Sequence, residues 1–160
     1  MVKITVICVG KIKEKYLKEA ISEYSKRLSR FCTLEIKEVA DEKTGENMSP
    51  AEETLVKDKE GERIAAALKP DDYLVTLEID GEMTTSRGLS EKLSGLLVKG
   101  VSKITFVIGG SVGLSDNIIQ RSHYHLSFSK MTFPHQLMRV ILLEQIYRSF
   151  KIAAGEPYHK

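Results

Sequence analysis

The sequence predicts a single α/β domain, residues 1–160, built around a mostly parallel β-sheet. Short apolar runs alternate along the chain with segments whose apolar residues recur every three or four positions, a pattern typical of strands connected by helices. The apolar run 104–108 ends in Gly109-Gly110-Ser111-Val112-Gly113, a turn that lets the main chain approach a ligand closely. With 160 residues, 42% of them hydrophobic, the chain is long enough for one domain with a full core.

The first quarter predicts a strand, a helix and a second strand. Residues 2–9 are apolar and β-branched and end at Gly10, as a buried strand would. The helix that follows has its apolar residues on one face, namely Leu17, Ala20, Ile21, Tyr24, Leu28 and Phe31. Residues 33–39 alternate as a strand, and the polar residues 41–48 predict a loop.

The middle of the chain predicts two further strand–helix pairs. Ser49-Pro50-Ala51-Glu52 is a capping box that begins a helix reaching about Leu68. A strand is expected over 73–79, with a turn at Asp80-Gly81. Leucines at 89, 93, 96 and 97 then indicate a helix that ends at Gly100.

The last third predicts strands over 104–108 and 124–128, with a short helix over 116–122 between them. A final helix runs from Pro134 to about Ile152. Ligands of parallel sheets bind beyond the carboxyl ends of the strands. Three such ends are therefore candidates for a binding cleft, residues 77–81, 108–113 and 128–133.

The final helix is apolar nearly all round, with Arg139, Glu144 and Arg148 expected to form one narrow polar stripe. Such a helix needs burial on two sides, one against its own sheet. We expect a second copy of the chain to cover the other side, because Met138, Ile141, Leu142 and Tyr147 would otherwise form a large exposed apolar patch. The sequence therefore predicts a homodimer.

Composition narrows the class of protein. Residues 1–30 carry eight Lys and Arg against three Glu, and residues 121–160 carry six against two, although the net charge is only +2. Two basic ends on one face would attract a phosphate backbone, but an ordinary solvated surface explains the same charges. No apolar stretch approaches the roughly 20 residues that span a membrane. The widely separated Cys8 and Cys32 indicate reduced, buried thiols in a cytoplasmic protein.

The sequence lacks the motifs of several well-known kinds of binding and catalytic site. The sequence has neither dinucleotide nor nucleoside-triphosphate loop, and it lacks the G-x-S-x-G of a hydrolase elbow. His123 and His125 would share a face of a strand, but no third ligand accompanies them, so no metal is expected. His135 is suited equally to the cleft and to the turn before the last helix. What remains is a group transfer driven by positioning, with Tyr158 and His159 as a pair able to exchange protons.

Four long motifs together resemble one family. They are the runs Phe106–Leu114 and Leu126–Gln136, the helix from Met138 to Arg148, and the ending Pro157-Tyr158-His159. In this order they are similar to the RlmH family of SPOUT-class rRNA methyltransferases, and the similarity covers nearly the whole chain. Val112 in the glycine turn is the one departure from the pattern.

The resemblance implies a carboxyl-terminal trefoil knot, a homodimer, and S-adenosylmethionine-dependent methylation of N3 of a pseudouridine in large-subunit (23S) ribosomal RNA. It implies that the cofactor lies against the three strand ends, at Leu77, Gly109, Phe128, Ser129, Lys130, Met131, Thr132 and Phe133. A non-catalytic RNA- or ribosome-binding module is the main alternative, and a small-molecule methyltransferase on the same scaffold is a second.

Roles for four further residues follow from chemistry. An imide N3 must lose a proton when it is methylated, and an imidazole such as that of His159 accepts a proton at neutral pH. Tyr158 would stack on the base, and Arg139 and Arg148 would hold phosphate or a developing negative oxygen. Because the tail lies beyond the final helix, we expect it to close over the cofactor slot of a partner subunit.

Overall fold

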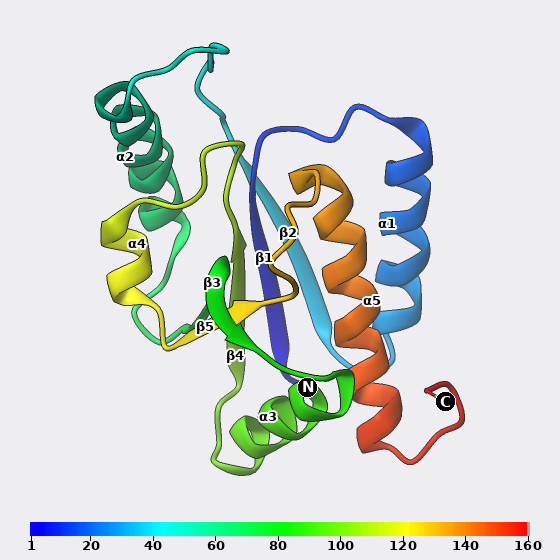
Figure 1. Cartoon of the computed structure of the whole chain (residues 1–160). Coiled ribbons are helices and arrows are strands. Elements are labelled where there is room, and N and C mark those ends of the chain that lie inside the picture. Colours follow the sequence, from blue (N-terminus) through cyan, green and yellow to red (C-terminus); the bar gives the residue numbers. More distant parts are fainter. Residues whose placement is uncertain (160) are drawn as a thin grey trace.

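The computed structural model describes residues 1–159 and consists of one parallel five-stranded sheet between two layers of helices (Figure 1). The strands lie in the order β2-β1-β4-β3-β5, and each hydrogen-bonded pair is parallel. The elements in chain order are β1 (Lys3–Val9), α1 (Lys15–Leu28), β2 (Thr33–Val39), α2 (Pro50–Ala67), β3 (Tyr73–Met83), α3 (Ser86–Val98), β4 (Lys103–Ile108), α4 (Asp116–Arg121), β5 (Tyr124–Ser127) and α5 (His135–Ala153).

Each face of the sheet has its own core. On one face, Val6 and Phe106 pack with side chains of α1, α3 and α5, whereas on the other Ile7 and Val107 pack with α2 and α4. Because successive residues of a strand point to opposite faces, a strand covered on both sides must be apolar throughout. This explains why β1 and β4 are continuous apolar runs and confirms the predicted α/β class.

Helix α2 begins where the capping box predicts, because its cap is encoded locally. The Ser49 hydroxyl accepts a hydrogen bond from the Glu52 N–H at 3.1 Å, and Thr85 and Ser115 cap α3 and α4 in the same way. Pro50 occupies the first turn of α2. Cys8 and Cys32 are free thiols buried in the core, as expected.

The predicted turn at Asp80-Gly81 is wrong, because β3 continues to Met83. Leu77 and Glu82 both pair with Leu126, so the intervening residues bulge out of the ladder. A Cβ on Gly81 would lie 2.9 Å from the His125 carbonyl oxygen. Glycine is thus needed at residue 81 for close contact between neighbouring strands rather than for a turn.

The surroundings of α5 differ from the expectation. α1 and α3 pack along its two sides, and both lie on the same face of the sheet as α5 (Figure 1). Leu142 is therefore fully buried within its own chain, and Tyr147 packs edge-on against Phe31 and Tyr158. Of the four residues expected to form an apolar patch, only Leu142 is buried; Met138, Ile141 and Tyr147 remain partly exposed, and Leu137 is exposed.

The chain path is consistent with a knotted carboxyl end. The β4–β5 connection passes β3 on the α2/α4 face, and residues 128–134 then return across the strand ends to α5 on the opposite face. Within residues 1–159, no helix has both the length and the apolar character required to cross a bilayer.

Candidate functional site

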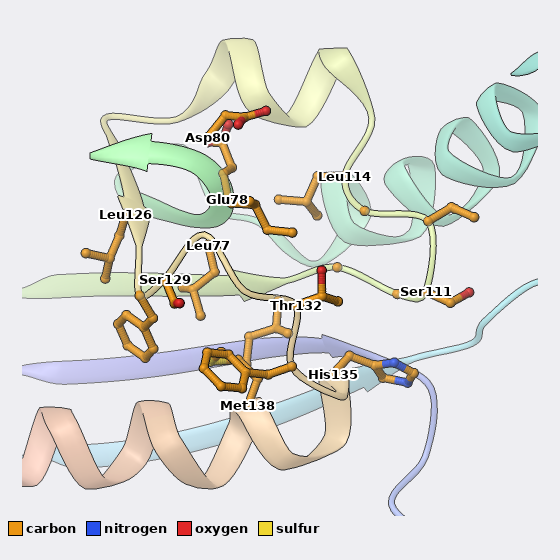
Figure 2. A pocket seen from close by; sticks show the side chains of 18 of the residues that line it. Leu77, Glu78, Asp80, Ser111, Leu114, Leu126, Ser129, Thr132, His135 and Met138 are labelled. Carbon is orange, nitrogen blue, oxygen red and sulfur yellow. The ribbon is translucent and has the colours of Figure 1, made fainter. Parts of the chain in front are cut away.

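A pocket of about 450 Å³ lies at the carboxyl edge of the sheet (Figure 2). It is formed by the end of β3, the loop after β4 and the segment after β5, together with His135 and Met138 of α5. These are the three strand ends that the sequence indicates. The volume falls within the range of about 300–1,000 Å³ that is usual for small-molecule sites.

Most of the expected cofactor residues line this pocket. Leu77, Gly109, Phe128, Ser129, Met131, Thr132 and Phe133 all do so, whereas Lys130 does not and is exposed. Glu78 and Asp80 fall within the predicted strand end 77–81 but are not singled out by the sequence as site residues, and Met138 is not predicted. Both residues lie in the bulged part of β3, between Leu77 and Glu82, so their place in the pocket wall depends on how β3 pairs with β5.

The glycine loop is closed by its own main chain. Gly110 and Gly113 form an isolated antiparallel bridge, in which the Gly113 N–H donates to the Gly110 carbonyl at 3.1 Å. A Cβ on Gly109 would lie 2.9 Å from the carbonyl carbon of Gly113. Gly113 has a φ of +89°, a conformation that L side chains rarely adopt. Glycine at residue 109 is thus required by the fold of the loop itself as well as by its position on the pocket wall.

Helix α2 supports this loop from behind. Glu60 is only 3% exposed, and its Oε1 would lie 3.0 Å from a Cβ on Gly110. Its Oε2 accepts a hydrogen bond from the Glu42 N–H at 3.0 Å. Burial, together with the negative charges of Asp41 and Glu42, raises the pKa of Glu60.

The segment that follows β5 is held to β3 by side-chain hydroxyls. The Ser127 hydroxyl donates to the Ile79 carbonyl at 2.9 Å, and the Ser129 hydroxyl accepts from the Met131 N–H at 2.9 Å. These bonds explain why the strand breaks after Ser127 without a glycine or proline nearby. The segment leaves the sheet as an irregular pocket wall and then enters α5.

Three ionisable side chains line the pocket, namely Glu78, Asp80 and His135. The Glu78 carboxylate accepts from the Thr76 hydroxyl at 2.6 Å and pairs with Nδ1 of His125. His135 also lines the pocket; burial and the nearby charge of Arg139 lower its pKa, so the ring is neutral at physiological pH. Among the described residues, no lysine or arginine lines the pocket.

His123 and His125 have separate partners rather than a shared ligand. Nδ1 of His123 accepts a hydrogen bond from the Leu74 N–H at 2.9 Å, while His125 pairs with Glu78. Across residues 1–159, no group of three or more His, Cys, Asp and Glu side chains is arranged to hold a metal ion.

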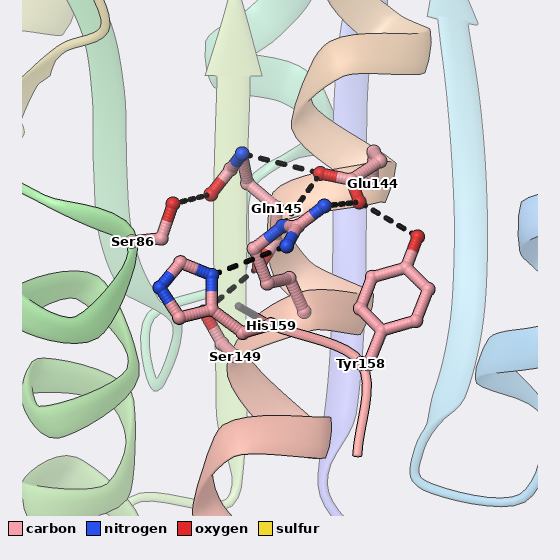
Figure 3. Close-up of polar contacts among 7 residues, drawn as sticks. Ser86, Glu144, Gln145, Ser149, Tyr158 and His159 are labelled. Atoms are coloured by element: carbon pink, nitrogen blue, oxygen red, sulfur yellow. Dashed lines mark hydrogen bonds and ion pairs between the residues drawn. The ribbon is translucent and has the colours of Figure 1, made fainter.

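The carboxyl-terminal tail folds back along α5, away from the pocket of its own chain (Figure 3). The Tyr158 hydroxyl donates to Oε2 of Glu144 at 2.8 Å, and Arg148 donates to the same carboxylate at 2.8 Å. Nη1 of Arg148 also lies 3.1 Å from Nδ1 of His159. Because a guanidinium only donates, Nδ1 is the acceptor and the proton of the neutral ring lies on Nε2.

The expected polar stripe of α5 is wrong. Arg139 and Arg148 are nine residues apart, and at about 100° per residue they lie on opposite sides of the helix. Arg139 is 2% exposed and donates to Oε2 of Glu38 at 2.6 Å and to the Gly10 carbonyl at 2.8 Å. Its guanidinium is thus committed to the protein interior, whereas Arg148 lies with the tail.

The family comparison agrees with the pocket and the strand order described above. Residues 2–159 match a family model described as a predicted SPOUT methyltransferase. The chain belongs to the SPOUT methyltransferase family. The resemblance inferred from the motifs is thereby confirmed, and the pocket at the strand ends is the candidate active site of a methyltransferase.

Individual relatives of this SPOUT methyltransferase are similar over almost their entire length. The chain is 60% identical over 157 residues to the "Ribosomal RNA large subunit methyltransferase H" of Clostridium novyi (strain NT), covering 98% of this chain and 99% of the relative. It is 62% identical over 157 residues to a putative enzyme of the same name from Methanococcus maripaludis, with the same coverage.

A solved structure has the same fold. It is described as that of a probable methylase family protein from Haemophilus influenzae Rd KW20 and gives a TM-score of 0.52 over 99% of this chain and 70% of that one. The sequence identity is 13%, so this likeness concerns the fold alone.

Proposed function

We propose that this SPOUT methyltransferase transfers a methyl group from S-adenosylmethionine to N3 of a pseudouridine in the 23S RNA of the large ribosomal subunit, on assembled ribosomes in the cytoplasm. The observation that carries the proposal is the pocket of about 450 Å³, which is lined by residues of all three predicted strand ends. The relatives named for large-subunit ribosomal RNA, at 60% identity over nearly the full chain, support the choice of substrate.

The residues of the pocket fit this cofactor. Residues 108–114 and 128–133 offer main-chain donors and acceptors for the edge of an adenine, and Leu77, Leu126 and Met138 offer apolar contacts for its faces. The wall carries Glu78 and Asp80 but, among the described residues, no lysine or arginine. This charge suits a sulfonium cation, which when bound supplies an activated methyl group.

The protein's task is then to align the acceptor and manage one proton. The new bond joins N3 to the methyl carbon, the sulfur–methyl bond breaks, and the N3 proton leaves to a base. His159 is the proposed base and Tyr158 a positioning residue. Burial and the hydrogen bond to Glu144 raise the pKa of Tyr158 to about 12, so its hydroxyl keeps its proton and acts as a hydrogen-bond donor.

A homodimer with composite sites completes the proposal. Tyr158 and His159 do not line the pocket of their own chain, so a second subunit is needed to bring a tail to each slot. Partly exposed Leu137 and Ile141 on α5 are the proposed contacts between the subunits. In this structure, Nη1 of Arg148 donates a hydrogen bond to Nδ1 of His159. The imidazole must therefore move away from Arg148 before Nδ1 can accept a proton.

The test is transfer of a labelled methyl group to ribosomes that lack the modification, followed by identification of the methylated nucleoside. The proposal expects N3-methylpseudouridine in the 23S RNA. Cofactor binding without transfer to any RNA would favour a non-catalytic RNA-binding module, and transfer to free nucleosides would favour a small-molecule enzyme.

A second test concerns the tail. A chain truncated after Pro157 should bind the cofactor normally and lose single-turnover methylation. Near-normal turnover by the truncated chain would remove His159 from the role of base.

A further inference from the structure

Residues 11–18, Lys-Ile-Lys-Glu-Lys-Tyr-Leu-Lys, form an exposed basic segment beside the pocket. They comprise most of the loop between β1 and α1 and the first turn of α1. Four lysines, at positions 11, 13, 15 and 18, face solvent and outnumber the single carboxylate, Glu14. Lys11, Lys13 and Lys18 make no ion pair within residues 1–159, and Lys15 makes only a long contact of 3.8 Å with Glu19.

Tyr16 interrupts this run of charge. Its ring is 68% exposed, the largest exposure of any aromatic side chain in residues 1–159. The next residue, Leu17, is buried at 5% and anchors the helix, so Tyr16 is held outward on a fixed backbone. A largely exposed aromatic ring with lysines on both sides is suited to stack on an unpaired base.

The segment is fastened to the site already described. The Gln136 side-chain amide donates to the Lys11 carbonyl at 3.3 Å, next to His135 in the pocket wall. The Ile12 N–H donates to Glu38 at 3.0 Å, and the buried Arg139 holds both Glu38 and the Gly10 carbonyl. The basic segment and the start of α5 are therefore one rigid unit at the pocket mouth.

The opposite rim has the other charge. Asp80 lies in the pocket wall and Asp116 begins α4, and residues 109–120 contain no lysine or arginine. Two carboxylates from outside the segment lie on this side: Glu38, which accepts from the Ile12 N–H and is paired with Arg139, and Asp41, beside Gly10. A phosphate backbone therefore meets an attractive surface at the β1–α1 side of the mouth and a repulsive one at the α4 side.

We propose that residues 11–18 are the RNA-docking segment of this enzyme: the lysines at 11, 13, 15 and 18 bind phosphates next to the acceptor nucleotide, and Tyr16 stacks on an unpaired base that flanks it. The inference rests on the proposed function for the identity of the RNA. Beyond the proposed function, it identifies the surface that binds the RNA and the side of the pocket from which the acceptor nucleotide enters.

The experiment compares three full-length variants with the unaltered protein. They are the triple substitution Lys11→Gln, Lys13→Gln, Lys15→Gln, and the single substitutions Tyr16→Ala and Tyr16→Phe. Lys69→Gln with Lys99→Gln is the control, because both lysines are exposed at the opposite edge of the sheet, where the helices lead into β3 and β4. Calorimetry gives cofactor affinity, and titration with large ribosomal subunits at several salt concentrations gives RNA affinity.

The triple variant should bind subunits about tenfold or more weakly at ~0.1 M salt, with the slope of log K against log salt smaller by about 2 to 3. Tyr16→Ala should weaken binding by about 5- to 100-fold, while Tyr16→Phe keeps it, because stacking needs only the ring. All variants should bind the cofactor as the unaltered protein does.

Unchanged subunit affinity in both the triple variant and Tyr16→Ala overturns the inference, as does an equal loss in the Lys69/Lys99 control. The proposed function fails separately, if the unaltered protein transfers no methyl group to ribosomes. Methyl transfer by the unaltered protein together with full activity of the variants would retire this docking segment and leave the proposed function standing.

Discussion

Arg139 and Glu38 form an ion pair at 2.6 Å in which the arginine side chain is 2% exposed and the glutamate 37% exposed. The pair ties the first turn of α5 to the end of β2, and Arg139 also binds the carbonyls of Val9 and Gly10 at the end of β1. One buried guanidinium thus fixes three chain segments around the pocket mouth. Its Nε has no partner.

Replacement of Arg139 by Met should lower the free energy of unfolding by about 2–3 kcal/mol, because two carbonyls and a partly buried carboxylate lose their donor. Urea denaturation at pH 7 measures the loss. The surface pair of Lys103 and Asp71 serves as control: Lys103→Met should change stability far less, because solvent screens an exposed ion pair. Equal effects of the two substitutions would contradict a structural role for Arg139.

Gly109→Ala should weaken cofactor binding by about tenfold or more while the protein still unfolds cooperatively. The new methyl group would lie 2.9 Å from the carbonyl carbon of Gly113, so the loop must open to admit it. Calorimetry measures the affinity. Gly95→Ala is the matched control, since a Cβ there has nothing within 4 Å and α3 gains helix propensity. Undiminished affinity in Gly109→Ala would remove residue 109 from the site.

Acidification should weaken cofactor binding through His135. Burial lowers the pKa of this imidazole, so folding favours the neutral ring. The neutral His135 ring therefore stabilises the folded protein fully at pH values above about 6.5, the pKa of histidine in the unfolded chain. This stabilisation is lost as the pH falls toward the lower pKa of His135 in the folded protein. Below that pKa a charged ring would face the sulfonium cation.

Calorimetric titrations with the cofactor between about pH 5 and pH 8 test this directly. The affinity of the unaltered protein should decline only as the pH falls to the lowered pKa of the folded imidazole, below about pH 6.5, and His135→Gln should abolish that decline. A decline of the same size in the variant would assign the titration to another group.

Tyr158→Phe should reduce single-turnover methylation by about tenfold and leave cofactor affinity unchanged, because the tail loses its hydrogen bond to Glu144. With a pKa of about 12, the Tyr158 phenol is protonated throughout the neutral range, so its loss should not alter the shape of the pH–rate profile near neutrality. A profile that changes shape in the variant would mean that the phenol itself exchanges a proton.

Ile141→Glu should convert the proposed dimer to monomers, because it places a charge on the partly exposed stripe of α5. Val98→Glu is the control, as Val98 is 88% exposed at the end of α3. Sedimentation equilibrium at micromolar concentration distinguishes the species. A folded monomer formed by the unaltered chain would rule out the dimer.

The sequence by itself determined the α/β class and the start of α2, which depend on local chemistry, and it indicated the three strand ends that form the pocket. Ser49, Thr85 and Ser115 cap helices within three residues, and strands buried on both faces must be apolar throughout. Family motifs supplied the cofactor segment, and seven of its eight expected residues line the pocket.

Only the tertiary structure decided features that depend on distant contacts. Arg139 looks like a surface arginine until α5 packs beside the end of β1 and its guanidinium meets Glu38, 101 residues away. Asp80-Gly81 reads as a turn until β5 lies against β3 and needs a residue without a side chain at that point. Local pattern fixes which residues must be buried or capped, but which partner each residue meets is set by the packing of segments far apart in the chain.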